Sequence, residues 1–370
     1  MKSVEKYHKM LSLEPFRSRE EMPVYPQMIT TFASIAGRTQ AEVYDDVDLW
    51  LECVDKTVDI IGKFDVCMPN FPSDAVFGMA LKARIPGREL GENELYQFIE
   101  TPYFDDPAEY KRIYEMGWSN WNMKYLMDIQ TPPYTSFEQV GARFQRLGQN
   151  MGKVIQHLYA RDIVPAYDTA VNPIYDGLSL IRSMADFTCD LYEDPGPIMD
   201  IINKYQPEED ERTIGMLKAN GGTRVSIYAM RSSCTFISPA MFEEYVWPSL
   251  SATIRRYWAA GITCVIHADA NWLPMLKYFT QLPKGCCHIE LDGATDIEQA
   301  YEILRGSQSI RGDVPSTMFV YDKPEDVAAY CEKLINMGMK GGFMLSSGCE
   351  VPMNAKPENV KAMLDAVKLK

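Results

Sequence analysis

The sequence of 370 residues is poor in histidine and lacks long apolar runs. Four histidines, His8, His157, His267 and His288, leave few candidates for a site that needs imidazole. No run of 18 or more apolar residues occurs, so the sequence predicts no membrane-spanning helix. The N-terminal residues MKSVEKYHKMLSLEPF are charged and lack the apolar core of a secretion signal. We therefore expect a cytoplasmic protein.

Paired cysteines and an excess of positive charge are also missing. The nine cysteines are scattered without a CxxC pair, as expected for reduced thiols rather than a disulfide framework. A net charge of −14 argues against a nucleic-acid partner, whose phosphates need a basic surface. The charge is compatible with a protein partner, a second copy of the chain, or a small uncharged substrate.

Short apolar segments that alternate with amphipathic helical segments are what the sequence does contain. Such alternation predicts parallel strands covered by helices. The strands are expected within residues 22–29, 65–70, 162–171, 224–230, 262–271, 286–293, 309–314 and 342–350. Eight such units without a GxGxxG turn favour one closed (β/α)8 barrel over an open dinucleotide-binding sheet. We expect residues 1–370 to form this single domain.

Residues 84–137 interrupt the alternation. The segment is rich in proline, tyrosine and tryptophan, as in IETPYFDDPAEYKRIYEMGWSNWNMKYLMDIQTPPYTS. Long segments of this kind between regular units are often functional loops or lids. We therefore expect an insertion or lid within the barrel.

Several reactive side chains follow predicted strands. Active sites of (β/α)8 barrels form where the carboxyl ends of the strands meet. The residues at such ends are Arg231, His267, Asp269, Glu290, Asp313 and Cys349. Imidazole, carboxylate and thiolate are the ligand types of zinc, so His267, Asp269, Glu290 and Cys349 are candidate ligands. The alternatives are a structural histidine held by hydrogen bonds and a cysteine that only fills space.

Four longer motifs resemble the uroporphyrinogen decarboxylase superfamily. They are MPVYPQMITTFASIAGRTQAEVYDD, DFTCDLYEDPGPIMDIINK, ISPAMFEEYVWPSLSATIRRYWAAGITCVIHADAN and GGFMLSSGCEVPMNAKPENVKAMLDAV. The resemblance covers most of the chain except the aromatic insertion, and it implies the barrel of that superfamily. The arginine-rich N-terminal motif, the catalytic aspartate turn and the late histidine of the decarboxylases are missing.

The corrinoid-dependent methyltransferases of this superfamily are the better match. They carry His-x-Cys on one strand and a cysteine after the last, and these three residues bind zinc. Here His267 and Cys349 stand at matching places, but Asp269 replaces the second thiol. A carboxylate leaves zinc harder and better suited to an oxygen ligand. Glu290 lies where the resemblance implies a further carboxylate near the metal.

The resemblance implies a zinc-dependent methyltransferase that acts as an O-demethylase component. Its methyl donor would be an aryl methyl ether, and its acceptor the cobalamin-type corrinoid of a separate partner protein. Asp269, Glu290 and Arg231 are the expected catalytic residues. The insertion would supply an aromatic wall for the substrate, or act only as a structural lid. The residues expected to orient the substrate are Tyr167, Asp168, Asn172 and Ser232.

Two alternatives remain open. The first is an acceptor-side enzyme that moves a methyl group from a corrinoid to a thiol or to tetrahydrofolate, although Asp269 counts against the thiol version. The second is a non-catalytic barrel that binds a corrinoid protein. Metal content separates this last reading from the other two, because a scaffold needs no bound zinc.

Overall fold

The computed structural model describes residues 1–368, and all its strands except β3 and β4 lie within the predicted segments. Each of the eight predicted segments contains a strand, because each is an apolar run bounded by turn-forming residues. The strands are β1 (Val24–Tyr25), β2 (Val66–Cys67), β3 (Lys82–Arg84), β4 (Gln97–Ile99), β5 (Val164–Pro165), β6 (Thr169–Val171), β7 (Arg224–Tyr228), β8 (Thr263–Ala268), β9 (Cys287–Leu291), β10 (Ser309–Val314) and β11 (Phe343–Ser347).

Seven of these strands form one curled parallel sheet in the order β1-β11-β10-β9-β8-β7-β6. β2 and β5 form a separate parallel pair. A backbone hydrogen bond of 3.0 Å from Asp65 N to Val24 O links the β2 segment to β1. The predicted continuous eight-stranded barrel is thus seen as a seven-stranded sheet and a two-stranded pair.

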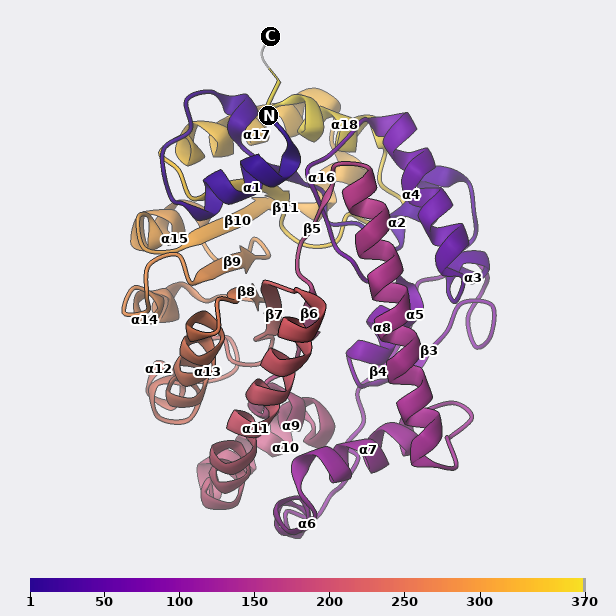
Figure 1. Ribbon diagram of the computed structural model, residues 1–370, viewed down its shortest axis with the longest axis vertical. Coiled ribbons are helices and arrows are strands. Elements are labelled where there is room, and N and C mark those ends of the chain that lie inside the picture. Colours follow the sequence, from indigo (N-terminus) through magenta and orange to yellow (C-terminus); the bar gives the residue numbers. More distant parts are fainter. Residues whose placement is uncertain (369–370) are drawn as a thin grey trace.

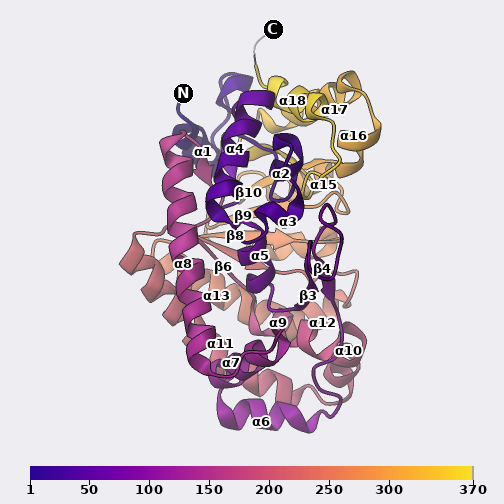
Figure 2. The ribbon, with the colours of Figure 1, turned by 90° about the vertical axis from the view of Figure 1, so that its right-hand side faces the viewer.

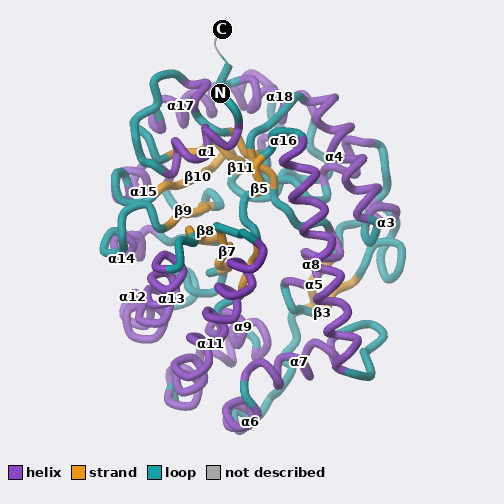
Figure 3. The backbone as a smooth tube through the Cα atoms, in the orientation of Figure 1, coloured by secondary structure: helices purple, strands orange, loops and turns teal. Residues whose placement is uncertain are grey.

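Helices surround the sheet (Figures 1 and 3).

The helices of the chain are α1 (Ser3–Leu11), α2 (Thr31–Ala36), α3 (Gln40–Val43), α4 (Val47–Ile61), α5 (Pro72–Gly78), α6 (Ala108–Met116), α7 (Trp118–Ile129), α8 (Phe137–Ala160), α9 (Ile174–Arg182), α10 (Met184–Glu193), α11 (Gly196–Asn220), α12 (Pro239–Met241), α13 (Trp247–Ala259), α14 (Leu276–Phe279), α15 (Ile297–Leu304), α16 (Ser316–Tyr321), α17 (Pro324–Gly338) and α18 (Pro357–Asp365). In Figure 1, α13, α14 and α15 lie along the outside of β8, β9 and β10.

The helix that begins at Ser238 shows how local sequence sets these elements. The Ser238 hydroxyl accepts a hydrogen bond of 3.2 Å from Met241 N, which satisfies one free amide of the first turn. Pro239 follows, where its fixed backbone angle suits a helix start. A π-helical turn, Phe242–Val246, joins α12 to α13. Ser238 and Pro239 together therefore fix where this helix begins.

The aromatic segment is more regular than its composition indicates. It contains the hairpin β3–β4 and the helices α6 and α7. Trp118, Trp121 and Tyr125 are buried on one face of α7, and their rings stack at 6.2 and 5.9 Å. The spacing of these aromatic residues follows the helical period, so they hold α7 against the rest of the protein.

We refer to residues 82–100, which comprise β3, β4 and the residues between and after them, as the strap. Figure 2 shows the hairpin on the side toward which the strands of the sheet run. The loop between β3 and β4, at the tip of the hairpin, is fixed by a backbone hydrogen bond of 2.9 Å from Ala41 N to Glu92 O. Just beyond the C-terminal end of the strap, Tyr103 N donates to Ile181 O at 2.8 Å. The strap therefore spans the carboxyl ends of the strands between two fixed points.

Among residues 1–368, the structure contains no helix with both the length and the apolar character needed to cross a membrane.

Candidate active site at the carboxyl ends of the strands

Strand register places a row of polar residues inside the sheet. Tyr228 pairs with His267, His267 pairs with Glu290, and Glu290 pairs with Arg311. Residues that pair across parallel strands project to the same face of the sheet. The four side chains therefore lie at one level in β7, β8, β9 and β10.

The last three members of this row form a continuous chain of contacts. His267 Nδ1 lies 3.0 Å from Glu290 Oε2. Arg311 Nε lies 2.8 Å from Glu290 Oε1. Arg311 is fully buried, and its remaining nitrogens donate to Gln27 Oε1 at 2.6 Å and to Ser346 Oγ at 2.8 Å. The carboxylate of Glu290 is thus held from both sides.

The pKa shifts of Glu290 and His267 agree with these contacts. Burial favours the neutral form of Glu290, but Arg311 and His267 outweigh burial and hold the pKa of that carboxyl well below its usual range. Burial by itself would lower the pKa of His267, but the carboxylates of Asp269 and Glu290 raise it well above its ordinary value. The two carboxylates therefore favour the imidazolium form of His267 when no cation is bound.

Asp269 and Cys349 lie on the open side of His267. Asp269 Oδ1 is 3.3 Å from His267 Nε2. Cys349 follows β11 and is exposed. Partial desolvation and the Asp269 carboxylate raise the pKa of the Cys349 thiol, whereas His267 lowers it. The net rise in its pKa favours the protonated thiol when no cation is bound.

The chemistry of this donor set suits zinc, which binds nitrogen, oxygen and sulfur ligands. His267 is oriented as zinc-binding histidines are, with one ring nitrogen on a carboxylate and the other directed to a second donor. Both oxygens of Glu290 already have partners, so this residue is placed to orient His267 rather than to bind metal. Within residues 1–368, no three His, Cys, Asp or Glu side chains are close enough as they stand to hold a metal ion.

Arg231 and Ser232 follow β7 and are positioned by Asp176. Asp176 Oδ1 accepts from Arg231 N at 2.7 Å, and Asp176 Oδ2 accepts from Ser232 Oγ at 2.9 Å. Ser232 is buried and already bonded, so it supports the loop. The Arg231 side chain pairs with Glu100 of the strap at 2.9 Å.

The remaining residues that were expected to orient the substrate lie in different parts of the structure. The Tyr167 hydroxyl lies 3.1 Å from the Tyr228 hydroxyl, which places Tyr167 beside the polar row. Asn172 follows β6, and its amide donates to Gly78 O at 3.3 Å.

Asp168, also expected to orient the substrate, does not lie at the carboxyl ends of the strands, because the chain continues as β6 immediately after it. Asp168 Oδ2 instead accepts from Thr223 N at 2.8 Å and from Arg224 N at 3.0 Å. These contacts lie at the start of β7, at the end of the strands opposite to His267. Asp313 does lie at the carboxyl end of β10, but its carboxylate accepts from Tyr330 OH of α17 at 2.9 Å, so its side chain is directed to that helix.

Sequence reasoning missed three members of the site, Arg311, Tyr228 and Gln27. Arg311 had a usable signal, since a cation within the otherwise uncharged apolar start of a predicted strand (SIRG) needs a buried partner. Gln27 and Tyr228 stand in the first and fourth strand segments without any such signal. Their roles depend on which side chains face them.

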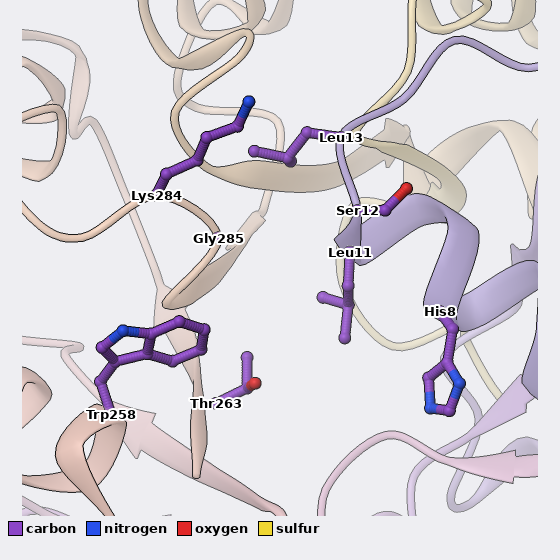
Figure 4. A pocket seen from close by; sticks show the side chains of 8 residues that line it. All are labelled: His8, Leu11, Ser12, Leu13, Trp258, Thr263, Lys284 and Gly285. Carbon is purple, nitrogen blue, oxygen red and sulfur yellow. The ribbon is translucent and has the colours of Figure 1, made fainter. Parts of the chain in front are cut away.

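An open pocket lies elsewhere in the molecule. Its volume is about 440 Å³, and it lies between the end of α1 and the starts of β8 and β9 (Figure 4). Figure 4 shows Leu11, Leu13 and Trp258 around it, with His8 and Lys284 toward its edges. Active sites of this fold form at the other end of the strands, so this pocket is not the candidate site.

The family model for uroporphyrinogen decarboxylase (URO-D) matches residues 179–369, slightly more than half of the chain. A methyltransferase from Methanosarcina mazei has a similar structure, with a TM-score of 0.71 over 99% of this chain and 98% of that one. The two sequences are 14% identical, so this likeness is one of fold. No curated protein sequence matches the chain. On the family match, the chain belongs to the uroporphyrinogen decarboxylase family.

Proposed function

We propose that the protein is a methyltransferase that moves a methyl group from an aryl methyl ether to the cob(I)amide of a separate corrinoid protein. The observation that carries the proposal is the row His267, Glu290 and Arg311, with Asp269 beside it and Cys349 nearby at the carboxyl ends of the strands. The methyltransferase with a similar fold supports this reaction class over decarboxylation.

The chemical problem for such an enzyme is the leaving group. As the methyl carbon–oxygen bond breaks, the oxygen keeps both electrons and becomes a phenolate, while the methyl carbon passes to the corrinoid. Stabilising the charge that develops on this oxygen lowers the activation barrier of methyl transfer. His267, Asp269 and Cys349 would hold a zinc ion, which supplies a Lewis acid for that oxygen when bound.

The other residues of this chain have supporting roles in the proposal. Glu290 orients His267 through Nδ1, and Arg311 holds Glu290 from the opposite side. Tyr228 would supply aromatic surface beside the reacting ether, and the buried Tyr167 holds its hydroxyl at 3.1 Å. In a metal-free enzyme the proton on His267 would instead neutralise the phenolate, because Asp269 and Glu290 favour the imidazolium by raising its pKa.

The proposal includes a complete (β/α)8 barrel as one domain. We infer that β2 and β5 close the gap in the seven-stranded sheet, with the Asp65–Val24 hydrogen bond on one side and the continuous residues from β5 to β6 on the other. Residues 84–137 then form an insertion whose strap covers the active site.

The test is methyl transfer from a panel of methoxylated aromatics to free and protein-bound cob(I)alamin, followed through the visible spectrum of the cobalamin. Formation of methylcobalamin that depends on His267 and Cys349 supports the proposal. Methyl transfer in the other direction only, from methylcobalamin to a thiol or to tetrahydrofolate, would assign the acceptor-side function. A protein that binds a corrinoid partner but holds no zinc and transfers no methyl group would be the non-catalytic barrel.

A further inference from the structure

A cation at the carboxyl end of β7 is paired only with a residue of the strap. The Arg231 side chain is 16% exposed and lies 2.9 Å from the Glu100 carboxylate, which is 42% exposed. Among the described residues, Glu100 is the only carboxylate recorded within ion-pair distance of this side chain. Arg311 differs, since its partner Glu290 comes from the adjacent strand and both are buried.

The two sides of the Arg231–Glu100 pair differ in how firmly they are held. Both oxygens of the buried Asp176 fix the loop that carries Arg231, at 2.7 and 2.9 Å. The Phe236 ring lies 5.7 Å from the guanidinium and further restricts it. Glu100 instead follows a two-stranded hairpin, and the neighbouring strands β3 and β4 are largely exposed. Arg231 is therefore a positioned cation with an exchangeable partner.

The strap also reaches the proposed reaction centre. Burial and then Glu350 raise the pKa of Tyr96, and Tyr228 and Cys349 add to this rise. Tyr96 is half-buried, and its ring packs against Phe98 of the same strap at 5.6 Å. The Glu100 contact holds the strap that carries this aromatic pair.

We propose that Glu100 occupies a subsite for the carboxylate of the substrate, and that an anionic substrate displaces it from Arg231. This inference rests on the proposed function, because it names the substrate class for the same site: an aromatic ether that carries a carboxylate. Arginine binds carboxylates through paired hydrogen bonds in a fixed plane, so a substrate carboxylate can replace that of Glu100 directly.

Displacement of Glu100 from Arg231 has a second consequence. The strap carries Glu89, Glu92, Glu94 and Glu100 against Lys82, Arg84 and Arg88, and Glu89 pairs with Arg88 at 2.7 Å. Charge repulsion therefore adds little, but an anion bound to Arg231 removes the ion pair between Glu100 and the loop that follows β7. The strap then leaves the carboxyl ends of the strands when the substrate is bound, which is when a separate methyl acceptor must reach the ether.

The experiment measures binding by calorimetry with 4-methoxybenzoate and its uncharged counterpart 4-methoxybenzamide, without any corrinoid. Arg231→Gln should weaken benzoate binding about tenfold or more and leave benzamide binding within about twofold, because only the charged contact is lost. Glu100→Gln should strengthen benzoate binding about threefold to tenfold, because a competing internal carboxylate is removed. Glu92→Gln removes the same charge from the same strap away from Arg231, and it should change neither affinity by more than about twofold.

Hydrogen exchange of residues 82–100 supplies a second readout. Exchange should rise in Glu100→Gln and in the wild type with 4-methoxybenzoate, but not with 4-methoxybenzamide. Equal affinity for both ligands in the wild type, or the same effect from Glu100→Gln and Glu92→Gln, would overturn the inference.

Failure of the proposed function looks different. Arg231-dependent binding of 4-methoxybenzoate without methyl transfer to cob(I)alamin would leave the carboxylate subsite standing and reject the methyltransferase. Demethylation of neutral ethers, with no preference for those that carry a carboxylate, would support the methyltransferase and reject the carboxylate subsite.

Discussion

His267 Nδ1 and Glu290 Oε2 lie 3.0 Å apart because the two residues pair in register on β8 and β9. Glu290 in turn pairs in register with Arg311, which is fully buried. One carboxylate therefore satisfies a histidine toward the open end of the strands and a guanidinium in the interior.

Glu290→Gln should destabilise the protein by about 3 kcal/mol, because it leaves the buried Arg311 without its counter-charge. Urea unfolding followed by circular dichroism measures this loss. Glu298→Gln is the control: it breaks an exposed pair with Lys333 at 2.7 Å and should cost at most about 0.5 kcal/mol. Adding Arg311→Met to Glu290→Gln should restore part of the stability. Equal stability of Glu290→Gln and the wild type would show that Arg311 does not depend on this carboxylate.

Protein purified without chelator should contain about one zinc ion per chain, as expected for a site with one histidine and one cysteine ligand. Cys349→Ser should lower the zinc content sharply, because the thiolate is its strongest ligand. Cys189→Ser changes another exposed cysteine, on α10, and should leave the zinc content unchanged. Elemental analysis of the three proteins decides the matter. If the wild type is active without metal, the zinc proposal is rejected and acid catalysis by His267 takes its place.

Asp269→Cys should keep zinc, since a thiolate is a good ligand, but should weaken methyl transfer from aryl ethers about tenfold or more. The reason is that a second thiolate makes the metal softer and less able to polarise oxygen. Tenfold corresponds to about 1.4 kcal/mol of transition-state stabilisation. Transfer rates and zinc contents of Asp269→Cys and Asp269→Ala are the measurement. If both variants hold zinc and transfer methyl groups at the wild-type rate, Asp269 is neither a ligand nor a tuning residue.

Asp176 makes folding stability depend on pH. Burial raises the pKa of this carboxyl to about 7, against the lowering effects of Arg231 and Ser232, while Asp269 raises it further. The folded protein therefore binds the proton more tightly than the unfolded chain does. Stability from this group is present below about pH 4 and falls as pH rises toward 7, by at most about 4 kcal/mol.

Asp176→Asn should flatten this dependence, because the amide does not titrate and can still contact Arg231 N and Ser232 Oγ. The measurement is the difference in unfolding free energy between the wild type and Asp176→Asn from pH 4 to 8. We expect the wild type to lose stability relative to the variant up to about pH 7, with no further change above it. A constant difference over this range would mean that Asp176 stays ionised in the folded protein.

The strand segments and the strand-end positions of His267 and Cys349 could be predicted from the sequence alone. Both depend on local information: apolar runs, turn residues and the polar side chains that follow them. The same reasoning failed at Asp168, where a polar residue interrupts a strand that continues as β6. It also described residues 84–137 by composition and overlooked the helical spacing of Trp118, Trp121 and Tyr125.

The residues that a strand-end histidine contacts were decided only by the tertiary structure. Glu290 could be named as a neighbour of His267, but whether it binds a metal or orients the imidazole depends on Arg311, whose contact follows from strand register. The Arg231–Glu100 pair joins β7 to a strap far away in the sequence. Contacts of this kind depend on the closure of the sheet and the path of an insertion, because side chains meet only after the whole chain has packed.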